Sequence, residues 1–434
     1  MLDYSKEPHG VFMWIDNKSF YASVESIMLG LNPMKSVLVV LSENDNTNGG
    51  LILATSPQAK KRYNLSNVDR KRDLPNDPNM IIVPPRMNLY IKKNLEINQI
   101  FTHFTEDKYV YPYSIDESVL DMTHTWQLFG DSPKQVARRI QKTVKRKLGL
   151  YTTVGIGENP LQSKVALDIL AKHDFQMMGT LTYETFGKKL WDVKPLNKVW
   201  SIGKNTAKHL NRYGIETLGD LAHTNPFWLK SQMGVIGGQL FAIANGIDRA
   251  QLDQPVRAKS KSVGNSQVLP HDYVHQDEIE VVIKEMGEQV ASRLRHLGKQ
   301  AKDIHLTVNY SFNARGKGYG KGFSHSHQIK ATDQTPVLNQ ALIQIFKRYW
   351  RKGASVRKIT VSYHQLTKVT HEQLDLFHHH KQQAKSSNVD KVIDHIREKF
   401  GNDAIIHPYS LEKGATRIKR NGLVGGHNGG NAFK

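Results

Sequence analysis

Short apolar runs alternate with amphipathic stretches over the first half of the chain. Residues 11–15 (VFMWI) and 37–41 (VLVVL) are rich in β-branched and aromatic side chains, so both are predicted to be buried strands. The segment between them, 19–28, predicts a helix. Residues 64–85 are polar and contain four prolines, which favours a loop.

The same alternation continues to about residue 175. The pattern predicts a helix over 88–101, a hairpin over 109–122 and a basic amphipathic helix over 133–148. Residues 151–157 predict another strand, which leads into a helix over 160–172. Strands and helices are therefore mixed throughout this half, which indicates an α+β fold.

The middle of the chain, 196–250, has a wholly helical pattern. It contains two Ile-Gly pairs, Ile202-Gly203 and Ile236-Gly237, and each is predicted to form a turn followed by a helical segment. The two turns are a weak internal repeat. A basic, polar linker follows Pro255.

Residues 263–368 show the order β-α-β-β-α-β, which is that of the ferredoxin-like motif. Strands 304–310 and 359–365 alternate apolar and polar positions, as half-buried strands do. The first helix is expected to bury one apolar stripe. Its members are Ile279, Val282, Ile283, Met286, Val290, Leu294 and Leu297.

Residues past 370 are rich in Gln, His, Ser and Gly, so a flexible tail is predicted. One short amphipathic helix interrupts it. The apolar positions of this helix are Val389, Val392, Ile393, Ile396 and Phe400. The last residues, GLVGGHNGGNAFK, are expected to be flexible.

Length and charge narrow the class of protein. At 434 residues, two to four domains are expected. Lys and Arg number 60 against 40 Asp and Glu, a net charge of +20 that suits a polyanionic partner such as nucleic acid. Residues 257–368 carry 19 of these cations and 8 of the anions, or +11, so this region is predicted to contact phosphates.

Composition also excludes several kinds of chemistry. The chain has no cysteine, which rules out disulfides, thiol nucleophiles and the usual structural zinc sites. The first ten residues do not have the pattern of a signal peptide, and no apolar run reaches the roughly 20 residues that span a bilayer. A cytoplasmic protein that does not enter membranes is expected.

Three carboxylates stand where predicted strands end. Asp16 closes the first strand, and Asp116 and Glu117 lie in the predicted hairpin. If they converged they would repel one another unless a cation neutralised them, and hard oxygen ligands select magnesium or manganese. The alternative is that each is a solvated turn residue, and spacing alone leaves that alternative open.

The segments 16–25 (DNKSFYASVE) and 114–118 (SIDES) resemble the two catalytic motifs of Y-family DNA polymerases. The branch they resemble most is the bacterial UmuC-like (ImpB/MucB/SamB) polymerases of translesion synthesis. The likeness extends over about 10–370 in the same order and includes 155–160 (GIGENP).

The resemblance implies a right-hand polymerase that transfers a deoxynucleotide from its triphosphate to a primer 3′-hydroxyl on template DNA. The implied domains are a palm (9–25 and 80–175), fingers (26–79), a helix–hairpin–helix thumb (176–256), a βαββαβ little finger (263–368) and a tail (369–434). In the family, Asp16, Asp116 and Glu117 would hold two Mg²⁺ ions, or Mn²⁺, with the Asn17 carbonyl as a further ligand. Asp121 would be structural.

The same resemblance assigns the nucleotide pocket. The backbone amides of Phe20 and Tyr21 would meet the triphosphate, and the Tyr21 ring would exclude a 2′-hydroxyl. Lys164 would neutralise charge on the leaving pyrophosphate, although a solvated helix lysine is the alternative. Where the family has an aromatic residue and an arginine, this chain has Pro57 and Lys60, so its grip on the triphosphate should be weaker.

Residues 199–215 resemble the helix–hairpin–helix of the family's thumb. Gly203, Lys204 and Thr206 would contact DNA phosphates through backbone N–H groups at a helix start. An ordinary helix connection is the alternative reading.

Gln373-Leu374-Asp375-Leu376-Phe377 resembles the peptide that docks on the bacterial sliding clamp. Gln373, Leu374, Leu376 and Phe377 would supply the contacts, and the motif would act as a tether. The alternative is that these residues form the last turn of the preceding domain.

Two other functions remain in competition. A two-metal nuclease would use the same acids, but it would have no role for Tyr21 or Lys164. A DNA-binding accessory factor with a weak or vestigial site would explain the altered Pro57 and Lys60 positions.

Overall fold

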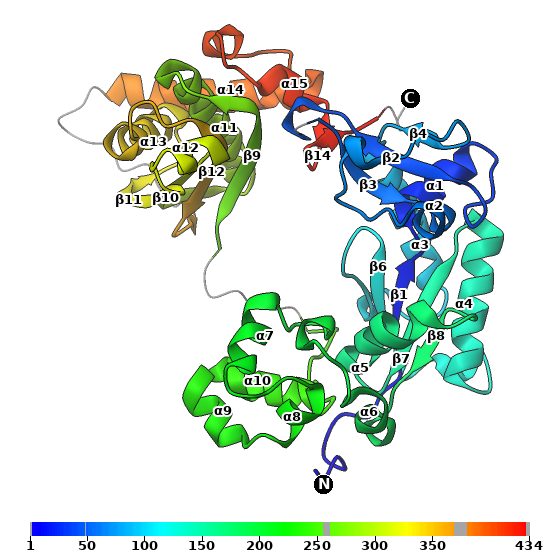
Figure 1. Cartoon of the computed structure of the whole chain (residues 1–434). Coiled ribbons are helices and arrows are strands. Elements are labelled where there is room, and N and C mark those ends of the chain that lie inside the picture. Colours follow the sequence, from blue (N-terminus) through cyan, green and yellow to red (C-terminus); the bar gives the residue numbers. More distant parts are fainter. Residues whose placement is uncertain (1, 48, 255–260, 369–379, 431–434) are drawn as a thin grey trace.

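The computed structural model describes residues 2–47, 49–254, 261–368 and 380–430. Figure 1 shows the palm and fingers on one side, the thumb and the little finger on the other, and the C-terminal segment crossing between the little finger and the fingers.

A mixed five-stranded sheet in the order β5-β6-β1-β7-β8 forms the palm. Its strands are β1 (Phe12–Asn17), β5 (Val110–Pro112), β6 (Glu117–Asp121), β7 (Thr152–Gly157) and β8 (Met178–Thr180). Helices α3 (Met87–Phe101) and α4 (Pro133–Leu148) share a core with Met13 and Ile15 of β1, whereas Trp14 points to the opposite face. This alternation is the strand periodicity that the sequence predicts.

The helix after β7 changes its winding. It starts as α5 (Pro160–Val165), continues as a π-helical turn η5 (Ala166–Leu170) and ends as a 3₁₀ turn η6 (Ala171–His173). The predicted regular helix over 160–172 is therefore interrupted. A Cβ atom on Gly155 would lie 2.0 Å from the Ser163 carbonyl oxygen, so only glycine allows α5 to pack this closely on β7.

The fingers contain a small sheet in the order β3-β2-β4. Its strands are β2 (Leu38–Ser42), β3 (Leu51–Thr55) and β4 (Ile81–Val83); α1 (Phe20–Met28) and α2 (Pro57–Tyr63) pack against it, and the short turns are η1 (Asp45–Thr47) and η2 (Lys71–Asp73). Because β4 pairs with β2, residues 81–83 lie in the fingers sheet and not in the palm as expected. In the same way, β8 extends the palm sheet past the expected boundary at 175.

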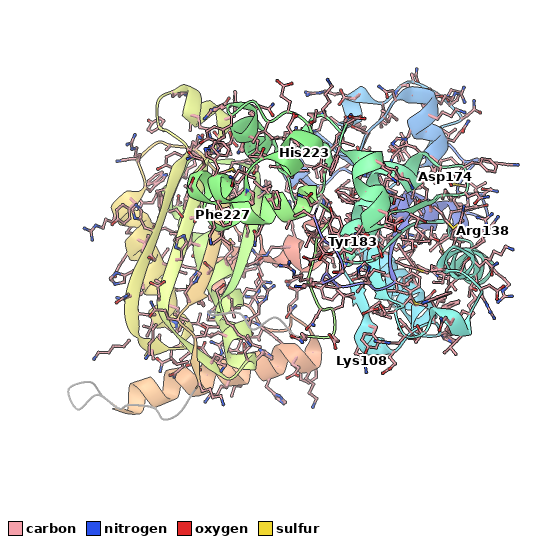
Figure 2. All side chains as sticks on the ribbon, turned by 90° about the horizontal axis from the view of Figure 1, so that it is seen from below. Lys108, Arg138, Asp174, Tyr183, His223 and Phe227 are labelled. Atoms are coloured by element: carbon pink, nitrogen blue, oxygen red, sulfur yellow. The ribbon has the colours of Figure 1, made fainter. Side chains whose placement is uncertain are left out.

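The thumb is helical, as predicted. It comprises α6 (Tyr183–Leu190), η7 (Leu196–Lys198), α7 (Lys204–Asn211), α8 (Leu218–His223), α9 (Pro226–Met233) and α10 (Val235–Ala244). Figure 2 places Tyr183 between the palm and the helices that carry His223 and Phe227. The prediction of a turn at Ile236-Gly237 is wrong, because both residues lie inside α10 and the turn is at Gly234, whose φ is 63°.

The little finger has the predicted βαββαβ order around a sheet β11-β10-β12-β9. Its elements are β9 (Val263–Tyr273), α11 (Gln276–His296), β10 (Lys299–Tyr310), α12 (Phe312–Gly316), β11 (Gly322–Thr332), α13 (Thr335–Tyr349), β12 (Val356–His364) and β13 (Thr367–Lys368). The predicted apolar stripe of α11 is buried except for Leu297, which follows the last helical turn and is 59% exposed.

The C-terminal region differs most from its prediction. It contains α14 (His380–Phe400), η8 (Pro408–Leu411), α15 (Arg417–Asn421), β14 (Leu423–Val424) and β15 (His427–Asn428). On α14, Val389, Val392 and Phe400 are exposed, whereas Asp390 and Asp394 are buried against a little-finger arginine. The expected apolar stripe is therefore wrong, and so is the expectation of a flexible end as far as residue 430. Among the described helices, none has both the length and the apolar character needed to cross a bilayer.

Candidate active site

The palm sheet brings the three predicted carboxylates to one edge. Asp16 in β1 stands directly opposite Glu117 in β6, and cross-strand partners project from the same face of a sheet. Asp116 comes just before β6. Its backbone oxygen accepts hydrogen bonds from the backbone N–H and from Nδ2 of Asn17, both at 2.9 Å.

The charge of Asp16 is costly in this position. Burial raises the pKa of the Asp16 carboxyl to about 6, and the neighbouring charges of Asp116 and Glu117 act in the same direction, whereas Lys172 and Lys164 oppose them. Mutual repulsion of this kind is expected where carboxylates gather to bind a cation.

Lys164 forms an ion pair with one of the three acids, Glu117. Its Nζ is 2.8 and 2.9 Å from the two oxygens of Glu117, and the lysine side chain is 6% exposed. Trp14 Nε1 donates to the same carboxylate at 3.2 Å. The structure therefore places Lys164 as the counter-ion of Glu117, although the resemblance placed it beside the triphosphate.

Lys172 is a site residue that the sequence analysis missed. Its Nζ is 3.9 Å from Asp16 Oδ2 and 2.7 Å from Asp168 Oδ1, and its side chain is 37% exposed. Asp168 also pairs with Lys164 at 3.3 Å, so one carboxylate joins the two lysines. Unlike Lys164, Lys172 keeps an open side from which it can meet a ligand.

The three acids are the candidate metal ligands. Among the described residues, no three His, Asp or Glu side chains are placed to hold one ion together. The donors nevertheless fit a hard cation, because they are carboxylate oxygens whose charge is destabilised by burial and mutual repulsion. Asn17 adds a buried Oδ1 atom that has no hydrogen-bond partner.

The two aromatic residues of the predicted sugar pocket differ in burial. Phe20 is buried in the palm core, whereas Tyr21 is half-buried and stacks on Tyr90. The Tyr90 hydroxyl donates to Glu25 at 2.7 Å, and Arg86 pairs with the same buried carboxylate. The Tyr21 ring therefore stacks on a Tyr90 side chain that Glu25 holds in place.

Lys60 faces the same acids from the fingers. Its helix α2 begins with Pro57, and Ser56 caps it by accepting from Ala59 N–H. Although Lys60 is largely exposed, desolvation of its ammonium lowers its pKa, as do Lys18 and Lys172, while Asp16 and Asp116 oppose the shift.

The thumb motif is built as predicted. Ile202 is buried in the thumb core, and Gly203 is the N-cap of α7, which has no side-chain cap. Lys204 is exposed and Thr206 is half-exposed, so the first N–H groups of α7 are open to a ligand. The clamp-like residues Gln373, Leu374, Leu376 and Phe377 lie outside the described part of the chain.

The palm acids, the fingers, the thumb and the βαββαβ domain together have the architecture of a Y-family DNA polymerase. A solved Y-family DNA polymerase chimera, Dbh-Dpo4(243-245)-Dbh, shares this fold with a TM-score of 0.65 at 20% identity, over 82% of this chain and 99% of the other. Models of the impB/mucB/samB family and of its C-terminal domain match residues 15–168 and 260–376. The chain belongs to the impB/mucB/samB family of Y-family translesion polymerases.

Similar proteins cover nearly the whole chain. One from Bacillus subtilis, named "Putative UV-damage repair protein UvrX", is 36% identical over 98% of this chain and 100% of its own length. "DNA polymerase IV 2" of the same organism is 34% identical over 96% of this chain and 98% of its own length. "DNA polymerase IV" of Moorella thermoacetica is 32% identical over 91% of this chain and 95% of its own length.

These comparisons confirm the predicted family, fold class and enzyme class, a DNA-directed DNA polymerase. The family acts on primer–template DNA with deoxynucleoside triphosphates and uses divalent metal ions. The roles of individual residues stay predictions.

Proposed function

We propose that this chain is an error-prone translesion polymerase that adds deoxynucleotides to a primer on damaged template DNA by two-metal nucleotidyl transfer. The observation that carries the proposal is the pairing of Asp16 with Glu117 across β1 and β6, beside Asp116 and opposite the cations of Lys172 and Lys60. Acids and cations at one edge suit a metal-bound triphosphate.

In the proposed site, Asp16, Asp116 and Glu117 hold two magnesium or manganese ions, with Asn17 as an additional oxygen donor. The metal, when bound, supplies Lewis-acid activation of the primer 3′-hydroxyl and neutralises phosphate charge. Lys164 offsets the charge of Glu117, which limits the repulsion among the acids. The 3′-oxygen forms a bond to the α-phosphorus as the bond to pyrophosphate breaks.

Two lysines are proposed to receive the triphosphate. Lys172 extends from the palm and Lys60 from the fingers, and the charge of Lys172 helps to lower the pKa of Lys60. Both are point charges that lack the planar fork of arginine, so they hold phosphates with less directional restraint. Together with Pro57, which cannot offer a hydroxyl, they make the incoming nucleotide less tightly oriented, as an error-prone polymerase requires.

DNA is proposed to lie between the thumb and the basic little finger. The N–H groups at the start of α7, next to Gly203, Lys204 and Thr206, contact phosphates without reading bases. The residues from Gln373 to Phe377 are proposed to tether the enzyme to a sliding clamp.

Primer extension on undamaged and lesion-bearing templates tests this proposal. Asp116→Asn should reduce the extension rate by about a hundredfold or more, because a charge needed in the transition state is lost. Asp121→Asn is the matched control, since Asp121 lies in the same hairpin and its side chain accepts only from the Thr123 N–H in the described contacts. Extension by Asp116→Asn at the parent rate would refute the assignment.

A DNA-binding accessory role is the second candidate, because Lys164 already neutralises Glu117, one of the three acids that a two-metal site would use. A parent protein that binds primed DNA but does not extend it with magnesium or manganese would support this role.

A further inference from the structure

The C-terminal residues 401–430, here called the strap, run from the end of α14 to the fingers (Figure 1). They contain η8, α15 and the β14–β15 hairpin. The strap contacts two domains that are far apart in the sequence, the fingers and the little finger.

At the little finger, the strap covers two acids on the outer face of α11. Glu285 accepts hydrogen bonds from the backbone N–H groups of Thr416 at 2.9 Å and Arg417 at 3.1 Å, and so caps the start of α15. Glu288 is 2.9 Å from Arg417 Nη1 and accepts from the Tyr409 hydroxyl at 2.8 Å. Both glutamates are fully buried although they are opposite the apolar core stripe of the helix.

Buried acids of this kind require their partners. Burial opposes the charge of Glu288, yet Arg417 and Arg397 lower its pKa overall, so the carboxylate is held ionised between two arginines. Gly414 lies so close to α11 that an added Cβ would be 2.6 Å from Cβ of Glu278. This end of the strap is therefore tightly packed and charge-matched.

At its other end, the strap is held by part-buried hydrogen bonds, and Val424 packs against the palm core. His427 Nδ1 is 2.9 Å from Ser42 Oγ, and Asn46 Nδ2 donates to the Gly426 carbonyl at 3.1 Å. Asn88 N–H, in the first turn of α3, which also carries Tyr90, donates to the Gly429 carbonyl at 2.8 Å. Lys419 pairs with Asp45 at 3.5 Å, and both side chains are exposed.

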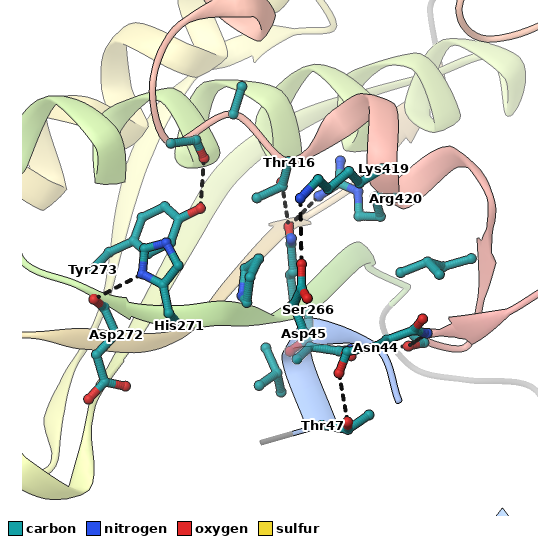
Figure 3. Close-up of a pocket in the computed structure, with 18 of the residues that line it drawn as sticks. Asn44, Asp45, Thr47, Ser266, His271, Asp272, Tyr273, Thr416, Lys419 and Arg420 are labelled. Carbon is teal, nitrogen blue, oxygen red and sulfur yellow. Dashed lines mark hydrogen bonds and ion pairs between the residues drawn. The ribbon is translucent and has the colours of Figure 1, made fainter. Parts of the chain in front are cut away.

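A cavity of about 1360 Å³ lies among the strap, β9 and the η1 turn. Figure 3 shows Thr416 and Arg420 of the strap, Ser266 and Tyr273 of β9, and Asp45 of the fingers around it. The fingers contact the little finger directly where η1 lies against β9, and the strap adds a second connection between the two domains.

We propose that the strap holds the little finger beside the fingers, and that it releases at its fingers end while it stays bound to α11. The asymmetry follows from the contacts: buried ion pairs and a helix cap hold the strap on α11, whereas part-buried hydrogen bonds hold it on the fingers. The chain already links the palm and fingers to the little finger through the thumb. When the strap is engaged, it links the little finger back to the fingers, so the four domains form a ring. Release removes one of the connections that close this ring while the direct contact of η1 with β9 remains, so the distance between the little finger and the fingers varies more.

Single-molecule energy transfer in the full-length protein tests the proposal. The chain has no native cysteine, so dyes can be attached specifically at Lys35→Cys in the fingers and Lys317→Cys in the little finger, both exposed positions. Two variants loosen opposite ends of the strap: Glu285→Ala/Glu288→Ala and Asn46→Ala/His427→Ala. The double variant Glu398→Ala/Glu412→Ala is the control, because it removes the same charge from exposed positions nearby.

Both loosened variants should increase, at least threefold, the fraction of molecules outside the main distance peak of the parent, and the control should not. Dissociation of primed DNA should accelerate by a similar factor. The Asn46→Ala/His427→Ala variant changes only polar contacts at the edge of the fingers, so it tests the idea even if the buried acids prove necessary for folding. A parent-like distance distribution in that variant would overturn the inference.

Discussion

Tyr21 stacks face to face on Tyr90, with ring centroids 4.2 Å apart and ring planes 13° apart. Because Tyr90 is itself held by Glu25, the ring of Tyr21, the predicted sugar gate, rests on a fixed neighbour. Tyr21→Ala should therefore lower the preference for deoxynucleotides over ribonucleotides by about tenfold or more, as expected when a pocket loses a steric clash.

The measurement is kcat/KM for the two kinds of triphosphate. Tyr111→Ala is the control, because Tyr111 is an exposed tyrosine of the neighbouring strand β5. Unchanged sugar discrimination in Tyr21→Ala would show that another group excludes the 2′-hydroxyl.

The pKa of Asp16 predicts how stability depends on pH without metal. An unfolded aspartate titrates near 3.8 and folded Asp16 at about 6, so the folded state binds the extra proton between these values. Its contribution to stability is therefore present at low pH and decreases as pH rises through this window. Asp16→Asn should be more stable than the parent at pH 8 in chelator, by about 1–3 kcal/mol, and equal to it near pH 3.

Thermal melting at the two pH values measures this difference. Added magnesium should then raise the melting temperature of the parent more than that of Asp16→Asn, because only the parent gains the full ligand set. Equal magnesium shifts would argue against Asp16 as a ligand.

Lys172 is expected to bind the triphosphate. Lys172→Gln should raise KM for the incoming nucleotide by about 10–100-fold, because a hydrogen bond to a charged group contributes about 1.5–3 kcal/mol. Lys142→Gln, an exposed lysine of α4, should leave KM unchanged. Steady-state extension measures both. If Lys172→Gln alters melting but not KM, Lys172 serves only Asp16 and Asp168.

The clamp motif predicts a separable defect. Leu376→Ala/Phe377→Ala should extend a short primed oligonucleotide normally but lose stimulation by a loaded sliding clamp, since two buried apolar anchors contribute about 1.5–3 kcal/mol each. Phe400→Ala/Leu411→Ala removes two exposed apolar side chains in the same region and serves as the control. Clamp binding by calorimetry at parental affinity in the first variant would remove the partner assignment.

Much of the fold follows from local patterns in the sequence. β1 and the stripe of α11 bury their apolar positions as their sequences predict, because β1 is covered on both faces and α11 packs one face on the little-finger core. The pairing of Asp16 with Glu117 also follows, since both motifs lie at predicted strands and the family resemblance joins them. The prediction that Leu297 is buried is wrong because this residue follows the end of α11.

Other features depend on contacts that no local pattern reveals. On α14, Asp390 and Asp394 are buried because Arg295, about 100 residues earlier, pairs with both. The strap is rich in glycine and polar residues, which is typical of flexible tails, yet it is ordered by buried acids on α11. Lys172 was missed because eight residues of a regular α-helix would turn it about 80° away from Lys164.

The π-helical turn η5 removes the angle of about 80° that a regular α-helix would place between Lys164 and Lys172. Seven residues of an α-helix advance about 700°, almost two complete turns, and the wide turn takes up one residue more, so Lys164 and Lys172 face the same side with Asp168 between them. The turn therefore accommodates one extra residue without changing the side of the helix on which Lys164 and Lys172 lie. A chain shortened by one residue within 166–170 could therefore rewind as an ordinary α-helix and still present both lysines to the acids.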